Sequence, residues 1–135
     1  MKPEKKKIVV VVDDDDLVCR VVEKVVGQIN LKCVKLNSGR NFESKLKEEG
    51  KKWALVVIDL VLPSGPTGWD IIDMIRRNPD MSDLGILVLT GASISSSETG
   101  RIEKNCCKVM KKQDFSISKF RDVVKQSLSA GTGKK

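Results

Sequence analysis

Short runs of aliphatic residues alternate along the chain with segments in which apolar residues recur every three or four positions. The runs occupy residues 8–12, 31–36, 54–62, 84–89 and 105–110. Runs of this length, rich in valine and isoleucine, are typical of strands, whereas three-four spacing is typical of amphipathic helices. The alternation therefore predicts five strand-helix units. Right-handed crossovers would then place helices on both faces of a doubly wound parallel sheet of the α/β class.

The helical segments differ in how strongly the pattern marks them. Six apolar residues form one stripe over 17–26, and Asp15 or Asp16 can cap that helix. Apolar residues at helical spacing also predict helices over 69–77 and 115–128, and a weaker pattern predicts one over 40–49. The polar, serine-rich segment 93–104 would be the least stable helix, because it has two evident apolar anchors, Ile94 and Ile102.

Acidic and hydroxyl residues stand where three of the predicted strands end. Asp59 lies near the end of the central run, four aspartates at 13–16 follow the first run, and Thr90 follows the fourth. In an open α/β sheet, ligands bind in the crevice outside the carboxyl ends of the strands. The sequence therefore predicts that these residues form a single polar site.

Length and hydropathy limit the class of protein. At 135 residues the chain fits one domain over 1–135, with a core of about 7–128 and tails at 1–6 and 129–135. The longest apolar runs have five to eight residues, far fewer than the roughly 20 that span a bilayer. The lysine-rich start is not followed by an apolar signal region. We expect a soluble, cytoplasmic protein that does not associate with membranes.

The chain has four cysteines and no histidine. The cysteines show no C-x-x-C spacing, which argues against a zinc site and favours small buried thiols in a reducing compartment. The lack of histidine excludes a phosphohistidine or a histidine base on this chain. The formal net charge is +7, but lysines crowd the two ends without interleaved aromatic residues, so nucleic-acid binding is not expected.

Four motifs follow one another along the chain: Val-Val-Asp-Asp-Asp, Ile-Asp-Leu-Val-Leu-Pro, Leu-Thr-Gly and Lys-Lys. With these motifs and spacings the chain resembles a response-regulator receiver domain, of the stand-alone kind found in chemotaxis regulators, over nearly its whole length. The resemblance implies a flavodoxin-like three-layer sandwich with strand order 2-1-3-4-5. It also implies a phosphoprotein of two-component signal transduction, which accepts a phosphoryl group from a histidine kinase or a histidine phosphotransfer protein.

The resemblance also implies roles at the site. Asp59 would be the phosphoacceptor, and Thr90 would be a switch hydroxyl that contacts the phosphoryl group. A lysine at the end of the fifth strand would contact the phosphoryl oxygens. Counting from Thr90 favours Lys112, and Lys111 stays open because an alternating strand points one of the two at the site. The implied cofactor is Mg²⁺, with ligands from Asp13, Asp14, Asp59 and the backbone carbonyl of Val61.

Four features depart from the usual pattern of this family. Gln113 replaces the proline that follows the site lysine, and the loop after Pro63 is one residue longer. Val109 stands where an aromatic switch residue is expected, and Val61 offers no polar side chain near the phosphoryl group. The first two changes concern local structure. The last two concern signal output and the lifetime of the aspartyl phosphate.

A receiver without an output domain must act through a partner protein, and receivers dock such partners on the face that corresponds here to residues 93–125. Between residues 101 and 125 this stretch has eight basic and three acidic residues, a net charge of +5. We therefore expect a partner with an acidic surface. The domain is not expected to be an enzyme beyond self-phosphotransfer and self-dephosphorylation.

Two other functions fit part of the pattern. Asp13-x-Asp15 after the first strand, followed by Leu-Thr-Gly and a lysine, resembles a haloacid-dehalogenase-like phosphohydrolase with Asp13 as its nucleophile. That alternative leaves Asp59 unexplained, and no acidic pair follows the lysine. A degenerate receiver that serves only as an interaction module would fit the missing aromatic and proline residues.

Overall fold

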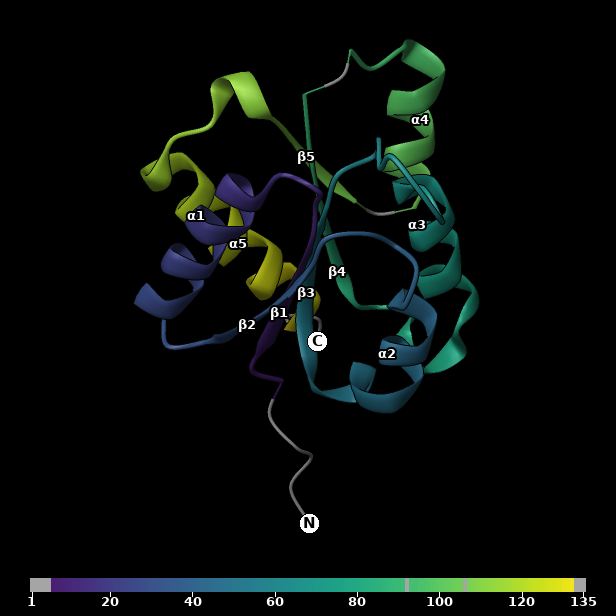
Figure 1. Ribbon diagram of the computed structural model, residues 1–135, viewed down its shortest axis with the longest axis horizontal. Coiled ribbons are helices and arrows are strands. Elements are labelled where there is room, and N and C mark those ends of the chain that lie inside the picture. Colours follow the sequence, from purple (N-terminus) through teal and green to yellow (C-terminus); the bar gives the residue numbers. More distant parts are fainter. Residues whose placement is uncertain (1–5, 92, 106, 133–135) are drawn as a thin grey trace.

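The computed structural model describes residues 6–91, 93–105 and 107–132, and its strands form one sheet between two layers of helices (Figure 1). The strands are β1 (Ile8–Val12), β2 (Lys32–Leu36), β3 (Trp53–Ile58), β4 (Gly85–Thr90) and β5 (Lys108–Lys111). Neighbouring strands are parallel, and their order is β2-β1-β3-β4-β5. The predicted fold class and strand order are confirmed.

Helices cover both faces of this sheet. One face carries α1 (Asp16–Gln28) and α5 (Ile117–Thr132). The other carries α2 (Phe42–Glu49), α3 (Gly68–Arg77) and α4 (Ser96–Lys104). Among the described residues, none of these helices is both long enough and apolar enough to cross a membrane.

The inner strands are aliphatic without polar alternation because both of their faces are buried. In β1, Val9 and Val11 contact the core beneath α1 and α5, whereas Val10 and Val12 contact the core beneath the opposite helices. The outer strands β2 and β5 contain lysines and are only partly buried. The position of a strand in the sheet therefore follows from how often polar residues interrupt its aliphatic run.

The central run predicts a strand through residue 62, but β3 ends at Ile58. The Asp59 N–H still donates to the Val12 carbonyl at the end of β1, at 3.1 Å. The chain then leaves the sheet. Leu60 and Leu62 are nevertheless each only 6% exposed and join the core on the α3 side. Burial in a loop, rather than strand pairing, explains why the aliphatic pattern continues.

The fifth strand begins at Lys108 and not at residue 105, so its predicted start is wrong. Asn105 caps α4, and its backbone N–H donates back into the last turn of that helix. The Cys107 N–H also turns back, to the Ile102 carbonyl at 3.1 Å. Backbone groups that close the end of a helix cannot also pair with β4. Cys106 lies outside the described residues.

The last helix extends beyond its apolar pattern. The sequence predicts a helix over 115–128 and then a tail, whereas α5 continues to Thr132. Residues after 128 have no apolar periodicity, so the pattern could not reveal this extra turn, which continues the backbone hydrogen bonding of the helix. The remaining parts of the predicted tails, 1–5 and 133–135, lie outside the described residues.

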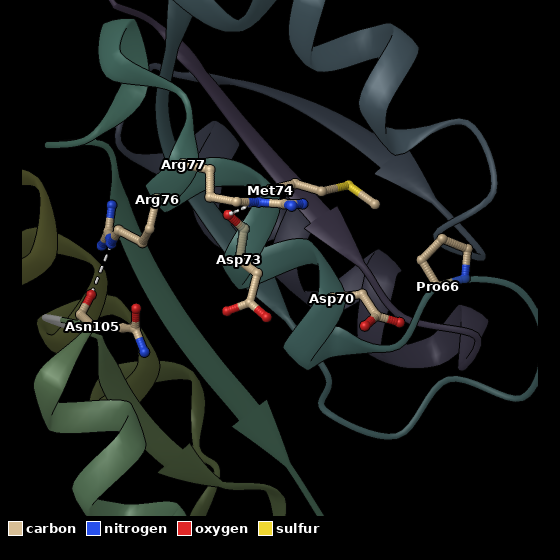
Figure 2. Close-up of a pocket in the computed structure, with 7 residues that line it drawn as sticks. All are labelled: Pro66, Asp70, Asp73, Met74, Arg76, Arg77 and Asn105. Atoms are coloured by element: carbon tan, nitrogen blue, oxygen red, sulfur yellow. Dashed lines mark hydrogen bonds between the residues drawn. The ribbon is translucent and has the colours of Figure 1, made fainter.

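Arg76 of α3 ties together the turns at the ends of α3 and α4. Its Nε donates to the Asn105 carbonyl at 2.8 Å, and a terminal nitrogen donates to the Leu84 carbonyl at 2.7 Å. Figure 2 shows Arg76 reaching from α3 toward Asn105, at a cavity of about 540 Å³ that Asp73 and Arg77 also line. Arg76 therefore fixes the end of α4, just before β5.

A second arginine holds the body of α4 against α3. The guanidinium of Arg101 lies over the Trp69 ring, 4.4 Å from its centroid. It also forms an ion pair with Asp73, at 3.3 Å. We refer to these two interactions together as the Arg101 contact.

Candidate functional site

The turn after β1 places a buried carboxylate next to a helix cap. Asp13 is 1% exposed, and its Oδ1 accepts a hydrogen bond from the Asp15 N–H at 2.9 Å. Asp15 Oδ1 in turn accepts from the N–H groups of Leu17, at 3.0 Å, and Val18, at 3.4 Å. Of the two predicted cap residues the structure selects Asp15. The cap fixes the turn that holds Asp13 at the carboxyl edge of the sheet.

Asp59 follows β3 directly and is 6% exposed. Its Oδ1 accepts a hydrogen bond from the Val61 N–H at 3.2 Å. The first residue of α3 comes very close behind it: a Cβ on Gly68 would lie 2.3 Å from the Asp59 carbonyl oxygen. Only a glycine permits this approach. The backbone of Asp59 is therefore held between β1 and the start of α3.

The ammonium group of Lys112 lies between the two buried carboxylates. Its Nζ is 3.0 Å from Asp59 Oδ2 and 3.0 Å from Asp13 Oδ2. Lys112 comes directly after β5, and a Cβ on Gly91 would lie 3.7 Å from its Cδ, so its stem runs beside the Gly91 backbone. Lys111 is exposed at the end of β5. The structure thus brings Lys112, and not Lys111, to the acidic pair.

Burial and pairing act in opposite directions on these charges. Burial raises the pKa of Asp13, although hydrogen bonds from the Asp15 N–H and Lys112 favour the ionised form. Burial also disfavours the charge on Lys112, but hydrogen bonds to Asp59 and Asp13 outweigh it and raise the Lys112 pKa. Lys112 is therefore cationic at neutral pH. The Asp13 carboxylate is incompletely compensated, and a further cation would stabilise it.

Thr90 reaches the same edge of the sheet from β4. It is the last residue of that strand, is fully buried, and lies opposite Lys111 in the register of β4 with β5. Parallel strands thus deliver Asp13, Asp59 and Thr90 to one edge, as the sequence predicts. A contact between Thr90 and a phosphoryl group stays a prediction.

The carboxylates of Asp13, Asp14 and Asp59 form an acidic cluster, in which one oxygen from each lies within 4.8 Å of the others. Asp14 is exposed, and the other two residues are buried. Mg²⁺ takes a few carboxylate oxygens and keeps several waters, so the donor set and the incompletely compensated charge on Asp13 both fit this ion. A ligand role for the Val61 carbonyl stays a prediction; the Val61 side chain is 62% exposed.

A comparison with protein families gives this arrangement its context. The family model of the response regulator receiver domain matches residues 9–125, which include every residue of the site. The chain belongs to this family. The family assignment made from the four motifs is confirmed, and the phosphohydrolase alternative is not supported.

Solved receiver structures share the fold. The beryllofluoride-activated NtrC4 receiver domain dimer matches with a TM-score of 0.80 and 24% identity, over 93% of this chain and 99% of that chain. The Vibrio cholerae chemotaxis protein CheY4 matches with a TM-score of 0.76 and 16% identity, over 89% and 97%. At such identities these receivers demonstrate the fold alone. No curated protein matches the chain.

The pattern of the sequence did not reveal the roles of two glycines of this receiver site. Gly68 precedes the helix predicted over 69–77, and Gly91 was given no role beyond its place in the Leu-Thr-Gly motif. The signal available for Gly68 was its place directly after Thr67, the N-cap of α3, where a residue with a side chain would favour the helix more. A glycine in the first turn of a helix indicates that another segment of the backbone comes close to the helix at that position.

Proposed function

We propose that this receiver is a phosphorylation-dependent switch in which Asp59 accepts a phosphoryl group from a phosphohistidine on a kinase or phosphotransfer protein. The main support is the position of the Asp59 carboxylate, which bonds Lys112 at 3.0 Å and belongs to the acidic cluster. An Asp59 oxygen attacks phosphorus, the P–N bond to the donor breaks, and the departing imidazole takes up a proton. The product is an aspartyl phosphate that water can later hydrolyse.

Phosphoryl transfer depends mainly on positioning and on charge neutralisation, and the residues around Asp59 supply both. Bound Mg²⁺, held by Asp13, Asp14 and Asp59, would neutralise the carboxylates and the phosphoryl oxygens. Lys112 adds a positive charge between Asp13 and Asp59. Thr90 donates to a phosphoryl oxygen after transfer, which makes it the sensor of the new state.

Labelling with a small phosphoramidate or acyl-phosphate donor tests this proposal. The wild type, Asp59→Asn and Asp13→Asn are incubated with and without Mg²⁺, and the mass of each protein is measured. We expect one added phosphoryl group on the wild type only with Mg²⁺, and none on Asp59→Asn. Asp13→Asn should be labelled slowly, because it weakens the metal site but keeps the nucleophile.

The same experiment separates the proposal from a degenerate interaction module. That module would stay unlabelled under every condition. Beryllofluoride with Mg²⁺ gives an independent check, because a ligand bound only by the native state raises the melting temperature. The wild type should melt higher with both additives and Asp59→Asn should not; an equal rise in the two proteins would place the bound group elsewhere.

The lifetime of the aspartyl phosphate would depend on the residue two positions after the acceptor. Val61 is exposed beside Asp59 and has no group that can orient an attacking water. We therefore expect slow self-dephosphorylation, and we expect Val61→Asn to speed it. An unchanged rate of phosphate release in Val61→Asn would contradict this account of the lifetime.

We call the proposed partner-docking face over residues 93–125 the output surface. It carries fewer freely exposed cations than its sequence suggests. Arg101 turns toward α3, Lys112 enters the site, and Arg121 bonds Gln28 of α1 at 2.6 Å. Exposed lysines remain on α4, β5 and α5, namely Lys104, Lys108, Lys111, Lys119 and Lys125. Lys111 and Lys119 line a cavity of about 430 Å³, together with Val109, Met110 and Asp114. This surface suits a partner with acidic groups around an apolar side chain.

Salt dependence tests the acidic partner. Association of charged surfaces slows as salt screens their attraction. The association rate of the phosphorylated receiver with its partner should fall steeply with ionic strength, and Lys111→Gln with Lys119→Gln should reduce that slope. A rate that does not change with salt would remove the acidic-partner proposal. The proposal includes a reducing, cytoplasmic setting, which the thiols of Cys19 and Cys33 support, because neither is part of a disulfide.

A further inference from the structure

The amino edge of the sheet, opposite the acidic cluster, gathers lysines from three separate segments. The Lys7 N–H donates to the Lys52 carbonyl at 3.1 Å, and the Lys32 N–H donates to the Lys7 carbonyl at 2.9 Å. The backbones of these residues thus lie next to one another where β2, β1 and β3 begin, with Lys32 in register with Ile8 of β1. Lys6 precedes the row, and Lys51 joins it from the 3₁₀ turn η1 (Gly50–Lys52). We call these five residues the lysine edge.

The charges of the lysine edge are not neutralised locally. All five side chains are exposed, and none takes part in an ion pair within the described part of the chain. Glu49, a nearby carboxylate along the chain, accepts a hydrogen bond from Trp53 Nε1 at 3.3 Å. Folding therefore brings five exposed lysines from segments that are far apart in the sequence to one edge of the sheet.

We propose that the lysine edge docks this domain on an anionic membrane surface. Neighbouring strands lie about 4.8 Å apart, so the row from Lys32 to Lys52 spans roughly 10 Å. Lysine ammonium groups are hydrated point charges on flexible stems, and they suit a plane of anionic headgroups, which attracts without fixed geometry. Each lysine close to such a surface strengthens binding by about fivefold.

The chemistry of the lysine edge favours a membrane over nucleic acid. Its five residues include no arginine for bidentate phosphate contacts, no amide for base edges and no aromatic ring for stacking. The row lies along the start of strands, so no helix of the lysine edge projects into a groove. A diffuse anionic plane therefore matches this surface better than a duplex or a single strand.

Docking through the lysine edge would leave the proposed phosphoacceptor accessible. Strands of five or six residues separate the two edges of the sheet by roughly 17–20 Å, so Asp59 would face away from the membrane. The expectation that the protein avoids membranes rested on the absence of a spanning run and of a signal region. Neither absence concerns a charged surface, and the fold places Lys32, Lys51 and Lys52 near Lys6 and Lys7, which changes that expectation for the membrane surface.

Co-sedimentation with vesicles tests the proposal on the full chain. Vesicles contain either phosphatidylcholine alone or phosphatidylcholine with phosphatidylglycerol, and binding is measured at low and high salt. The wild type should bind the anionic vesicles at low salt. The triple variant Lys7→Gln, Lys32→Gln, Lys52→Gln should bind them about 100-fold more weakly, because it removes three lysines.

A matched variant removes the same charge elsewhere: Lys111→Gln, Lys119→Gln, Lys125→Gln. Its vesicle binding should stay within about threefold of the wild type, because these exposed lysines lie outside the lysine edge. Equal losses in both triple variants, or no binding of the wild type to anionic vesicles, would overturn the proposal. So would tighter binding to duplex DNA than to vesicles at equal phosphate concentration. A lower melting temperature of the first variant with unchanged vesicle binding would instead assign the lysines to the stability of the fold.

Discussion

α3 and α4 lie next to each other on one face of the sheet and begin in the same way, yet they are held differently (Figure 1). Each starts with a capping box, Thr67 with Asp70 in α3 and Ser95 with Glu98 in α4. Four residues of α3 are buried, namely Gly68, Ile71, Ile72 and Ile75. Of the nine residues of α4, Ile102 is the buried one.

The comparison separates two tasks of a helix sequence. A cap decides where a helix begins, whereas buried area decides how firmly it is held against the sheet. α3 is packed firmly against the sheet, and its first residue contacts the backbone of Asp59. α4 is held by one apolar side chain, the Arg101 contact and the Arg76 bond at its end, so it is the element that can shift when the site changes.

Truncation of one buried isoleucine in each helix should show most clearly how differently α3 and α4 are held. Ile75→Ala should lower the free energy of unfolding by about 2–5 kcal/mol, because it leaves a cavity in a packed core. Ile102→Ala should cost less, because α4 can move to close its cavity. Denaturant unfolding of both variants measures the two values. Equal losses would show that α4 is held as rigidly as α3.

A methyl group at the start of α3 should have the next largest effect. Gly68→Ala puts a Cβ against the Asp59 carbonyl oxygen, and relief of that overlap moves either α3 or Asp59. We expect a loss of about 1–3 kcal/mol in unfolding free energy, together with slower phosphoryl labelling. Wild-type labelling and stability in this variant would mean that the close approach is not needed.

The Arg101 contact should contribute less to global stability and more to the local stability of α4. An exposed cation-π interaction is worth about 0.5–1 kcal/mol, and an exposed ion pair is worth about 0.2–1 kcal/mol. Arg101→Gln should therefore speed amide hydrogen exchange in 96–104 by several-fold. Arg20→Gln is the control, because Arg20 pairs with Asp16 within α1 and should leave exchange in α4 unchanged.

The smallest expected effect is a gain in stability. Gly100 lies inside α4, and a Cβ there would meet nothing within 4 Å. Gly100→Ala should stabilise α4 by about 0.5–1 kcal/mol, because alanine loses less conformational entropy than glycine in a helix. Exchange in 96–104 should slow. Gly27→Ala in α1, equally unobstructed, should not slow it; faster exchange in Gly100→Ala would contradict this reading of α4.

The residues at the strand ends could be predicted because they depend on local sequence, whereas the order of the strands was implied by the family resemblance. An aliphatic run between helical patterns marks an inner strand, and Asp59 and Thr90 reach one edge as soon as the strands are parallel. The weak anchoring of α4 was also visible, since Ile94 and Ile102 are its evident apolar residues, and the structure buries Ile102 and half-buries Ile94.

Contacts between distant side chains could not be predicted in this way. Counting from Thr90 favoured Lys112 but left Lys111 open, because the choice depends on how η3 (Lys112–Asp114) turns the chain after β5, and no periodicity records that turn. The Arg101 contact likewise joins Arg101 to Asp73, 28 positions away, and to Trp69, 32 positions away. In the sequence Arg101 is one more cation of an output surface; in the structure it belongs to the junction of two helices.

Trp69 beneath Arg101 gives the protein an optical reporter of its own. The chain has two tryptophans. Trp53 is fully buried and packs against Phe42, with ring centroids 5.5 Å apart, so its emission should stay constant while the core is intact. Emission of an indole responds to a charge held over its ring, and displacement of α4 would remove that charge from Trp69. Intrinsic fluorescence of the unlabelled wild type would therefore follow the motion of α4 in real time. The variant Trp53→Phe would isolate the signal of Trp69.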